Sequence, residues 1–377
     1  MSKFTKAIKH IEEKIIIKKE ISREFKKIKN KKRKKIISSI ALSQEQKQQI
    51  DEFYKSNYGQ KIPYDWHREF TAFTGKFDYK YIPEFIFLPI VERMFNDKRV
   101  SLVLSDKTLL PIFVNGLDYI YTPKIIACQT NNLDCKYDDK LISFDELIYK
   151  IQNIGYCFIK PAKETNSGKG CRVLNIKKGI DVLSNKNMIN ILNEYKNNFI
   201  IQNIIKNSDS ISKLHPQSLN TFRVITYMLN NKINVAPVSL RIGTGNNDVD
   251  NAHAGGMFIH VNNCNGKGLL DKYAFTEFKK VYEKHPDTLI QFENYEIFNF
   301  DKIINAARRL HEERFSMLGM ISFDFTLDNN ENVVLIEANS MGQACWLPQE
   351  AAGRALFSDD TALILQMARS FIKKNKF

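Results

Sequence analysis

The sequence has no long apolar segment. Hydrophobic residues make up 43% of its 377 residues, but no run approaches the ~18 consecutive apolar residues of a membrane-spanning helix. Residues 1–14 lack the apolar core and the small-residue cleavage site of a signal peptide. We therefore expect a cytoplasmic protein whose contact with a membrane, if any, is peripheral and at its inner face.

Cysteines are also sparse and dispersed. The chain has 6 of them, and no two form a Cys-x-x-Cys pair. A zinc site needs clustered ligands, and a disulfide framework needs an oxidising compartment. The pattern therefore favours free thiols at Cys128, Cys135, Cys157, Cys171, Cys264 and Cys345.

Positive charge, by contrast, is concentrated at one end. The net charge is +14, and residues 1–35 hold fifteen Lys and Arg against four Glu, which leaves only +3 for the rest of the chain. Apolar residues recur at helical spacing in the same segment, which predicts a basic amphipathic helix. The apolar stripe consists of Phe4, Ile8, Ile11, Ile15, Ile17, Ile21, Phe25 and Ile28.

Two interpretations of this helix stay open. Either its apolar stripe packs on the rest of the protein, or the helix lies on an anionic membrane surface. Nucleic acid is a weaker third interpretation, because no base-reading motif accompanies the basic run over residues 31–35. We expect no specific nucleic acid partner.

Cap residues and hydrophobic periodicity divide the remaining chain into elements. Ser43 and Gln46 fit a capping box at the start of a helix that Gly59 ends. From about residue 150 the pattern is rich in strands. The predicted elements are helices over 181–196, 301–318 and 359–373, strands over 198–205, 221–229 and 233–242, and a hairpin over 319–338.

The strongest chemical motif is this last hairpin, with predicted strands over 320–327 and 333–339. The turn between them is rich in Asp and Asn, which are typical turn residues. If the loop is Asn329–Asn332, then Asp328 pairs with Val333. That register places two carboxylates opposite each other further along the strands.

The two carboxylates belong to Asp324 and Glu337, and alternation puts Asn339 on the same face. Like charges ~5 Å apart repel by ~3 kcal/mol at an effective dielectric of ~20. A compensating cation is therefore expected, and two carboxylates with an amide oxygen suit magnesium. A register shifted by one residue would instead turn the carboxylates to opposite faces, and the sequence leaves that alternative open.

Phosphate-binding and charged candidates precede the hairpin. Lys160 ends a predicted strand, and a Gly-containing turn over 166–170 follows it with flexible backbone N–H groups. The turn is not a Walker A motif. Arg223 and Arg241 lie in otherwise apolar strands, where arginine needs a partner or a ligand.

In this order the motifs resemble those of the ATP-grasp superfamily, over about residues 100–345. The more specific resemblance is to the sugar-transfer-associated ATP-grasp group of bacterial surface-polysaccharide biosynthesis, and it extends to about residue 60. The segments that carry it are 66–70, 75–78, 81–83, 105–107, 158–161, 167–170, 214–223, 240–243, Asn251 with Gly255–Gly256, and Asp324 with Glu337–Asn339.

The resemblance implies an α+β, ATP-grasp fold in which two α/β lobes sandwich ATP, preceded by a small N-terminal domain and the basic helix. We expect four segments: a basic helical tail over 1–36, an N-terminal region over 37–105, a lobe with the phosphate lid over 106–202, and a lobe with the metal and acceptor site over 203–377.

Residue roles follow from the same resemblance. The matches to the ATP-binding positions are Lys107 and Lys160 at the phosphates, the lid residues Ser167, Gly168, Lys169 and Gly170, and Gln202 and Asn203 in the adenine hinge. The matches to the ligands of two magnesium ions are Asp324, Glu337 and Asn339. The expected catalytic residues are Arg241, Arg223 and Asn251, and the expected acceptor-binding residues are His253, Gly255 and Gly256.

The implied activity is an ADP-forming carboxylate–amine ligase. The γ-phosphoryl group of ATP moves to a carboxylate, and an amine then displaces the phosphate to leave an amide. The polysaccharide association suggests that the carboxylate is a uronic acid of a sugar or glycan in capsule biosynthesis. Two alternatives stay open: a small-molecule kinase that phosphorylates a hydroxyl group, and a non-catalytic ATP-binding scaffold held at a membrane by residues 1–35.

Overall fold

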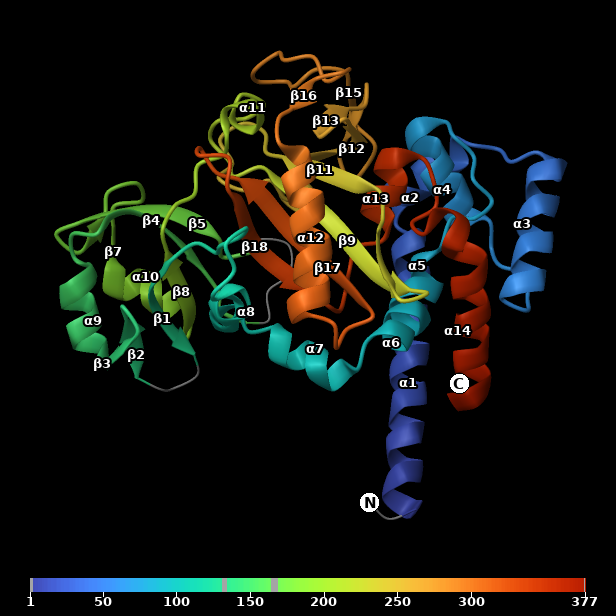
Figure 1. Cartoon of the computed structure of the whole chain (residues 1–377), viewed down its shortest axis with the longest axis horizontal. Helices are drawn as coiled ribbons and strands as arrows, with labels where there is room; N and C mark the ends of the chain where they lie inside the picture. The colour runs from blue at the N-terminus through green and yellow to red at the C-terminus, as the bar shows by residue number, and fades with distance from the viewer. Residues whose placement is uncertain (1–2, 131–133, 164–168, 376) are drawn as a thin grey trace.

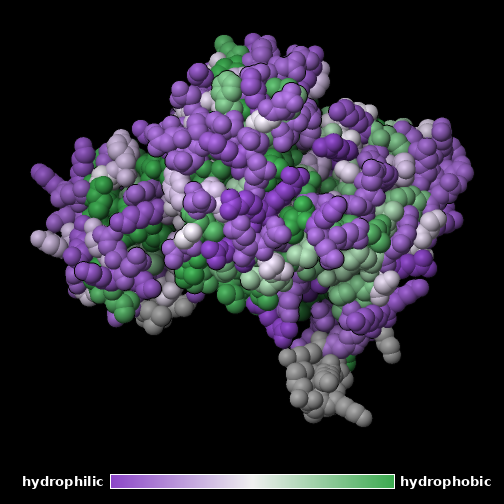
Figure 2. All heavy atoms as spheres, viewed as in Figure 1, coloured by the Kyte–Doolittle hydropathy of each residue, from purple (hydrophilic) through white to green (hydrophobic). Residues whose placement is uncertain are grey.

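The computed structural model describes residues 3–130, 134–163, 169–375 and 377. Figure 1 shows two β-sheets next to each other and a group of helices, from both ends of the chain, beside the larger sheet. All strand pairs within both sheets are antiparallel, so the predicted α+β class is confirmed. The face seen in Figure 2 is largely hydrophilic, with hydrophobic residues showing between polar ones.

The smaller sheet holds the segment between residues 125 and 202, in the order β3-β2-β1-β8-β4-β5-β6-β7. Two short strands occupy the beginning of the predicted 181–196 helix, so that prediction is wrong there. The elements are β1 Ile125–Thr130, β2 Cys135–Tyr137, β3 Lys140–Ile142, α9 Phe144–Ile151, β4 Gly155–Lys160, β5 Arg172–Lys177, β6 Ile180–Asp181, β7 Lys186–Asn187, α10 Met188–Glu194 and β8 Asn198–Gln202.

The larger sheet has ten strands, and its main path runs β15-β14-β12-β11-β9-β17-β18. The helix α12 lies along one of its faces (Figure 1). The elements are α11 Asp209–Ser212, β9 Thr221–Leu229, β10 Lys232–Val235, β11 Val238–Ile242, η3 Ala252–Ala254, β12 Met257–Cys264, β13 Lys267–Leu270, β14 Ala274–Phe275, β15 Val281–Tyr282, β16 Glu296–Ile297, α12 Phe300–Arg314, β17 Met320–Leu327 and β18 Val333–Asn339.

Of the remaining helices, those over 3–95 form an N-terminal helical region that the C-terminal helices complete, whereas those over 98–114 lie against the larger sheet. The predicted capping box is confirmed, since Ser43 Oγ accepts from Gln46 N and Gln46 Oε1 accepts from Ser43 N. The elements are α1 Lys3–Ile28, α2 Lys31–Ser38, α3 Gln44–Asn57, α4 Asp65–Thr74, α5 Glu84–Ile86, η1 Phe87–Val91, α6 Glu92–Phe95, α7 Lys98–Leu104, η2 Lys107–Leu109, α8 Leu110–Val114, α13 Trp346–Ala352, η4 Ser358–Asp360 and α14 Thr361–Asn375.

The basic N-terminal segment is helical as predicted, but it forms two helices that meet at Asn30. The Asn30 side chain accepts a hydrogen bond from Lys32 N and so caps α2. Ile17 and Ile28 are buried, and the Phe25 ring packs edge-on against Trp66 at 5.2 Å. The second half of α1 therefore packs on its own protein. None of the helices within the described ranges has the length and apolar composition needed to cross a bilayer.

A buried ion pair fastens α2 to α4. Arg33 Nη1 donates to Glu69 Oε1 at 2.7 Å, and Glu69 is almost fully buried. Burial raises the pKa of Glu69 to about 7, although the attraction of Arg33 opposes the rise. The pair therefore couples the position of the basic segment to the protonation of one interior carboxyl group.

Removal of this arginine should destabilise the fold in a pH-dependent way. We expect Arg33→Met to lower the free energy of unfolding by roughly 3–5 kcal/mol, because Glu69 is left buried without a partner. The deficit should be larger at pH 8 than at pH 5.5, because a carboxyl group with a raised folded-state pKa loses stability as the pH rises through that pKa. Urea unfolding at the two pH values measures both effects.

The matched control is Arg99→Met, which breaks the exposed Arg99–Asp97 pair. It should change the free energy of unfolding far less than Arg33→Met does, with little dependence on pH in this range, because exposed ion pairs contribute little. Equal losses in the two variants would contradict a structural role for the buried pair.

Candidate functional site

The predicted hairpin exists, and its register places the two carboxylates together. Asp324 on β17 lies directly opposite Glu337 on β18. The turn is one residue longer than predicted, because Leu327 and not Asp328 pairs with Val333. A bulge at Ile336 compensates for this shift, since Asp324 pairs with Glu337 while the next residue of β17 pairs with Leu335.

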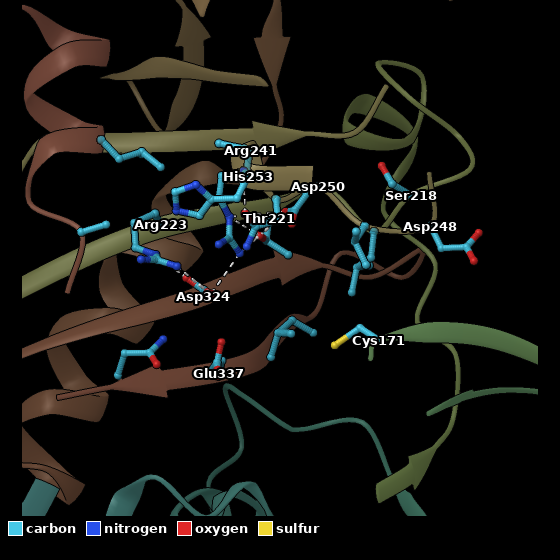
Figure 3. Close-up of a pocket in the computed structure, with 18 of the residues that line it drawn as sticks. Cys171, Ser218, Thr221, Arg223, Arg241, Asp248, Asp250, His253, Asp324 and Glu337 are labelled. Carbon is cyan, nitrogen blue, oxygen red and sulfur yellow. Dashed lines mark hydrogen bonds and ion pairs between the residues drawn. The ribbon is translucent and has the colours of Figure 1, made fainter. Parts of the chain in front are cut away.

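Two arginines from neighbouring strands hold Asp324. Arg223, which lies opposite it on β9, donates from Nε to Oδ1 at 2.6 Å and from Nη2 to Oδ2 at 3.1 Å. Arg241 of β11 donates from Nη2 to Oδ2 at 3.0 Å. Figure 3 shows both guanidinium groups converging on the carboxylate. Burial alone would raise the pKa of Asp324, but the two arginines lower it, so the side chain stays ionised.

Arg241 is itself fixed by two further side chains. Its Nε and Nη2 donate to Thr221 Oγ1 at 3.1 and 2.6 Å, and its Nε lies 3.5 Å from Asp250 Oδ2. The Thr221 hydroxyl in turn donates to Asp250. Burial opposes the charge of Arg241, but Asp250 and Asp324 raise the pKa of the guanidinium above its ordinary value. The arginine is therefore a permanently charged and immobile group.

Glu337 faces two lysines instead. Lys107 of η2 places its Nζ 3.1 Å from Glu337 Oε1. Lys160, at the end of β4 in the smaller sheet, is almost fully buried, and burial lowers the pKa of its ammonium group while Glu337 raises it. Three charged groups from three separate segments therefore meet beside the hairpin.

Asp324, Glu337 and Asn339 all line the same cavity and carry oxygen atoms of the kind that magnesium prefers, so they stay the predicted metal ligands. An ionised carboxylate has about four acceptor positions, and the three hydrogen bonds to Asp324 leave one free. Magnesium is commonly bound by one or two carboxylates together with waters and substrate phosphates. Within the described ranges there is no cluster of three or more His, Cys, Asp or Glu side chains placed for a metal, so a complete protein cage is not what this site offers.

One large cavity joins these groups where the two sheets meet the N-terminal helices. Its volume is about 1600 Å³, above the ~300–1,000 Å³ of a typical site for one small ligand. The predicted site residues that line it are Lys107, Lys160, Gln202, Asn203, Arg223, Arg241, Asn251, His253, Asp324, Glu337 and Asn339.

The predicted lid is only partly described. Ser167 and Gly168 lie outside the residues that the structure describes. Lys169 and Gly170 are exposed, and the nearby cavity wall is formed by Cys171 and Val173. The lid role therefore stays a prediction.

The two glycines of the expected acceptor loop shape the loop itself. Gly255 has a φ of 97°, and a Cβ atom on Gly256 would collide with the carbonyl group of Asp250. They are therefore needed for the turn of the chain, and their role in acceptor binding stays a prediction. The same loop presents Asn251 and His253 to the cavity.

His253 has a carboxylate partner that no sequence motif points to. Its Nδ1 lies 2.7 Å from Glu277 Oε2. Of the other side chains missed from the sequence, Thr221 lies two residues before Arg223, and Asp250 directly precedes Asn251. Both positions lie within two residues of a predicted site residue, whereas Glu277 is remote from every motif and only the fold brings it here.

A double-mutant cycle should detect the coupling within this network. We expect Arg223→Met to lower the free energy of unfolding by roughly 3 kcal/mol, because Asp324 loses two charge-assisted hydrogen bonds while buried. Combining it with Asp324→Asn should cost less than the sum of the single changes, by roughly 0.5–3 kcal/mol. Urea unfolding of the four proteins gives the coupling energy.

The exposed pair Lys267–Glu296 is the control for this cycle, with ammonium and carboxylate 2.7 Å apart. Lys267→Met and Glu296→Gln should couple by at most about 1 kcal/mol. Additive effects in the Arg223 and Asp324 cycle would contradict the network.

Among solved structures the chain is similar to several ligases. It matches D-alanyl-alanine synthetase A from Vibrio cholerae at 11% identity and a TM-score of 0.38, over 72% of this chain and 65% of that one. It matches D-alanine-D-alanine ligase from Helicobacter pylori at 14% and 0.38, over 73% and 63%, and the ATP-grasp ligase PsnB at 11% and 0.36, over 75% and 62%. The chain thus spans less than two thirds of the length of these proteins.

No curated protein matches the chain. A family model described as sugar-transfer associated ATP-grasp matches residues 91–363. The match begins later than the predicted resemblance and extends further toward the C-terminus, and it contains the hairpin, both arginines and both lysines. The chain therefore belongs to the sugar-transfer-associated ATP-grasp family and has the ATP-grasp fold.

Proposed function

We propose that the protein is an ADP-forming ligase that activates a carboxylate with ATP and joins it to an amine. The observation that carries the proposal is the meeting of Asp324 and Glu337 with Lys107, Lys160 and Arg241 in one cavity. Members of the ATP-grasp family are typically ADP-forming ligases that use ATP and Mg²⁺. The two α/β lobes would hold the nucleotide between them.

In this proposal, different groups of cavity residues bind the adenine, the phosphates and the metal. Gln202 and Asn203 would border the adenine, and Lys107 and Lys160 would bind the phosphates as compact positive charges. Asp324, Glu337 and Asn339 would hold Mg²⁺, which supplies charge neutralisation at the transferring phosphoryl group. Arg241, fixed by Thr221 and Asp250, would add a preorganised positive charge there.

The proposed reaction has two steps, phosphoryl transfer and then attack by the amine. A carboxylate oxygen attacks the γ-phosphorus atom, the bond to ADP breaks, and an acyl phosphate forms. The amine nitrogen then attacks the acyl carbon, phosphate leaves, and the nitrogen loses a proton. In this proposal the proton goes to His253. Its Nδ1–H group donates to Glu277, so the unprotonated Nε2 atom is free to accept the proton. Arg223 and Asn251, which also line the cavity, would position the carboxylate.

The family description ties the activity to sugar transfer, and we propose a uronic acid residue of a sugar or surface glycan as the carboxylate. Such a substrate presents a carboxylate on a polar ring with many hydroxyl groups. The cavity wall includes the polar side chains of Asn251 and Gln343.

Hydroxylamine trapping tests the ligase proposal against a kinase on the same fold. With ATP, Mg²⁺ and a set of uronic acids, the wild type should release ADP and form a hydroxamate, because hydroxylamine captures acyl phosphates. Glu337→Ala should reduce both products at least 100-fold while the circular dichroism spectrum is unchanged, because a metal ligand is lost. Glu296→Gln, a change at an exposed position of β16, is the matched control and should keep full turnover.

Two results would contradict this proposal. If the Glu337→Ala variant still releases ADP with the same Mg²⁺ dependence, Glu337 is not a ligand of the catalytic metal. A phosphorylated product that resists hydroxylamine would identify a kinase, in which His253 takes a hydroxyl proton.

We also propose that the first half of α1 contacts anionic membranes. Ile8, Ile11 and Ile15 are 41%, 56% and 47% exposed on a basic helix that projects from the body (Figure 1). The second half packs on the protein, so a tether would involve only the residues before Ile17.

Vesicle sedimentation tests this membrane contact. Replacing Ile8, Ile11 and Ile15 with Asn should reduce binding to phosphatidylserine vesicles at least tenfold and leave ATP turnover unchanged. Leu363→Asn, at an exposed apolar position on α14, should have no effect on binding. Equal sedimentation of the triple variant and the wild type would contradict the tether.

A further inference from the structure

The corner between α1 and α2 forms part of the wall of the large cavity. Its contribution consists of Arg23, Lys26, Lys27, Lys29, Asn30 and Arg33. These residues precede the segment that the family model matches, which begins at residue 91. The corner is also a different part of the cavity wall from the one formed by Lys107 and Lys160, so its charges add to those beside the hairpin.

Two of these positive charges, those of Lys26 and Lys29, have no carboxylate partner among the residues that the structure describes. Glu24 lies 3.2 Å from Arg23 and 3.0 Å from Lys27, and the Arg33 side chain is bound by Glu69. Among the described residues, no carboxylate lies within ion-pair distance of Lys26 or Lys29. Both side chains are exposed to the solvent of the cavity, where they attract anions.

A chain of contacts connects this corner with the acceptor loop. Arg33 Nη2 lies 3.9 Å from Glu277 Oε1, and the other oxygen of Glu277 lies 2.7 Å from His253 Nδ1. Beside this contact, the Lys32 ammonium group lies 4.5 Å from the centre of the Phe278 ring. The basic corner therefore adjoins the loop that carries Asn251 and His253.

Gln343 is an independent sign of a polar ligand in this cavity. It is 1% exposed, and neither its side-chain oxygen nor its side-chain nitrogen has a hydrogen-bond partner within the described part of the chain. Its backbone is fixed, because Gln343 N donates to Glu92 Oε1 at 2.8 Å. A buried amide without partners costs free energy, and a small rotation of the side chain toward the cavity that it lines would let a polar substrate supply them.

We propose that the α1–α2 corner, through Lys26 and Lys29, binds a second anionic group of the acceptor, either a phosphate or a further carboxylate. This rests on the proposed function, which places the reacting carboxylate near Arg223. The cavity is large enough for a nucleotide and a second, extended substrate together. The acceptor class is thus a polyanionic molecule, and the two lysines select it from acids that have one carboxylate.

Calorimetric titration of the full chain tests this site. The protein is first saturated with Mg²⁺ and a non-hydrolysable ATP analogue, so that Lys107 and Lys160 are occupied. Inorganic pyrophosphate and tricarballylate are then titrated separately at low ionic strength. We expect at least one of them to bind, with an affinity that falls as salt is added, because exposed charges are screened.

Charge reversal at the two lysines is the decisive variant. Lys26→Glu with Lys29→Glu should weaken binding of the anion at least tenfold, and Lys26→Gln with Lys29→Gln should weaken it less. The matched control is Lys18→Glu with Lys19→Glu, the same charge change at exposed positions of α1 that do not line the cavity. This control should bind the anion as the wild type does.

Each outcome decides one point. Tighter binding of pyrophosphate indicates a phosphate, and tighter binding of tricarballylate indicates a further carboxylate. Binding of neither anion to the wild type, or equal losses in the Lys26/Lys29 and Lys18/Lys19 variants, would overturn the site. Failure of the ATP analogue to bind in the first step would instead contradict the proposed function, and the comparison of the variants in the unloaded protein would still report on Lys26 and Lys29.

Discussion

The carboxylate of Asp324 lies on a central strand, and the site depends on how its charge is balanced. β17 is flanked by β9 and β18, and all of its residues are buried. A charge in that position is tolerated only with close partners and hydrogen bonds. Arg223 and Arg241 supply them, and Thr221 and Asp250 hold the second arginine. The need to neutralise the charge of Asp324 therefore fixes β9, β11 and β17 relative to one another. Glu337 is left facing the cavity.

Attraction between opposite charges also links the two sheets at the site. Lys160 ends a strand of the smaller sheet, yet the electrostatic environment of its ammonium group includes Glu337 of the larger sheet. Negative charge on the hairpin thus faces positive charge from the other lobe. A nucleotide with its metal would enter between charges that are already arranged for it, which is the preorganisation that phosphoryl transfer requires.

The sequence predicts the local parts of the site better than the long-range ones. Alternation within two strands is enough to bring Asp324, Glu337 and Asn339 together, although the bulge at Ile336 corrects a turn predicted one residue too short. The stripe of α1 is visible in the sequence, but which half packs depends on the surface presented by Trp66 and its neighbours. Glu277 reaches His253 through the fold alone, so no spacing in the sequence predicts the pair.

The most direct test of the account is a crystal structure with Mn²⁺ and a non-hydrolysable ATP analogue, because Mn²⁺ accepts the oxygen ligands of Mg²⁺ and scatters anomalously. We expect anomalous density within coordination distance of Asp324 and Glu337, with the phosphates against Lys107 and Lys160. Metal density away from this hairpin, or a nucleotide bound outside the cavity, would contradict it.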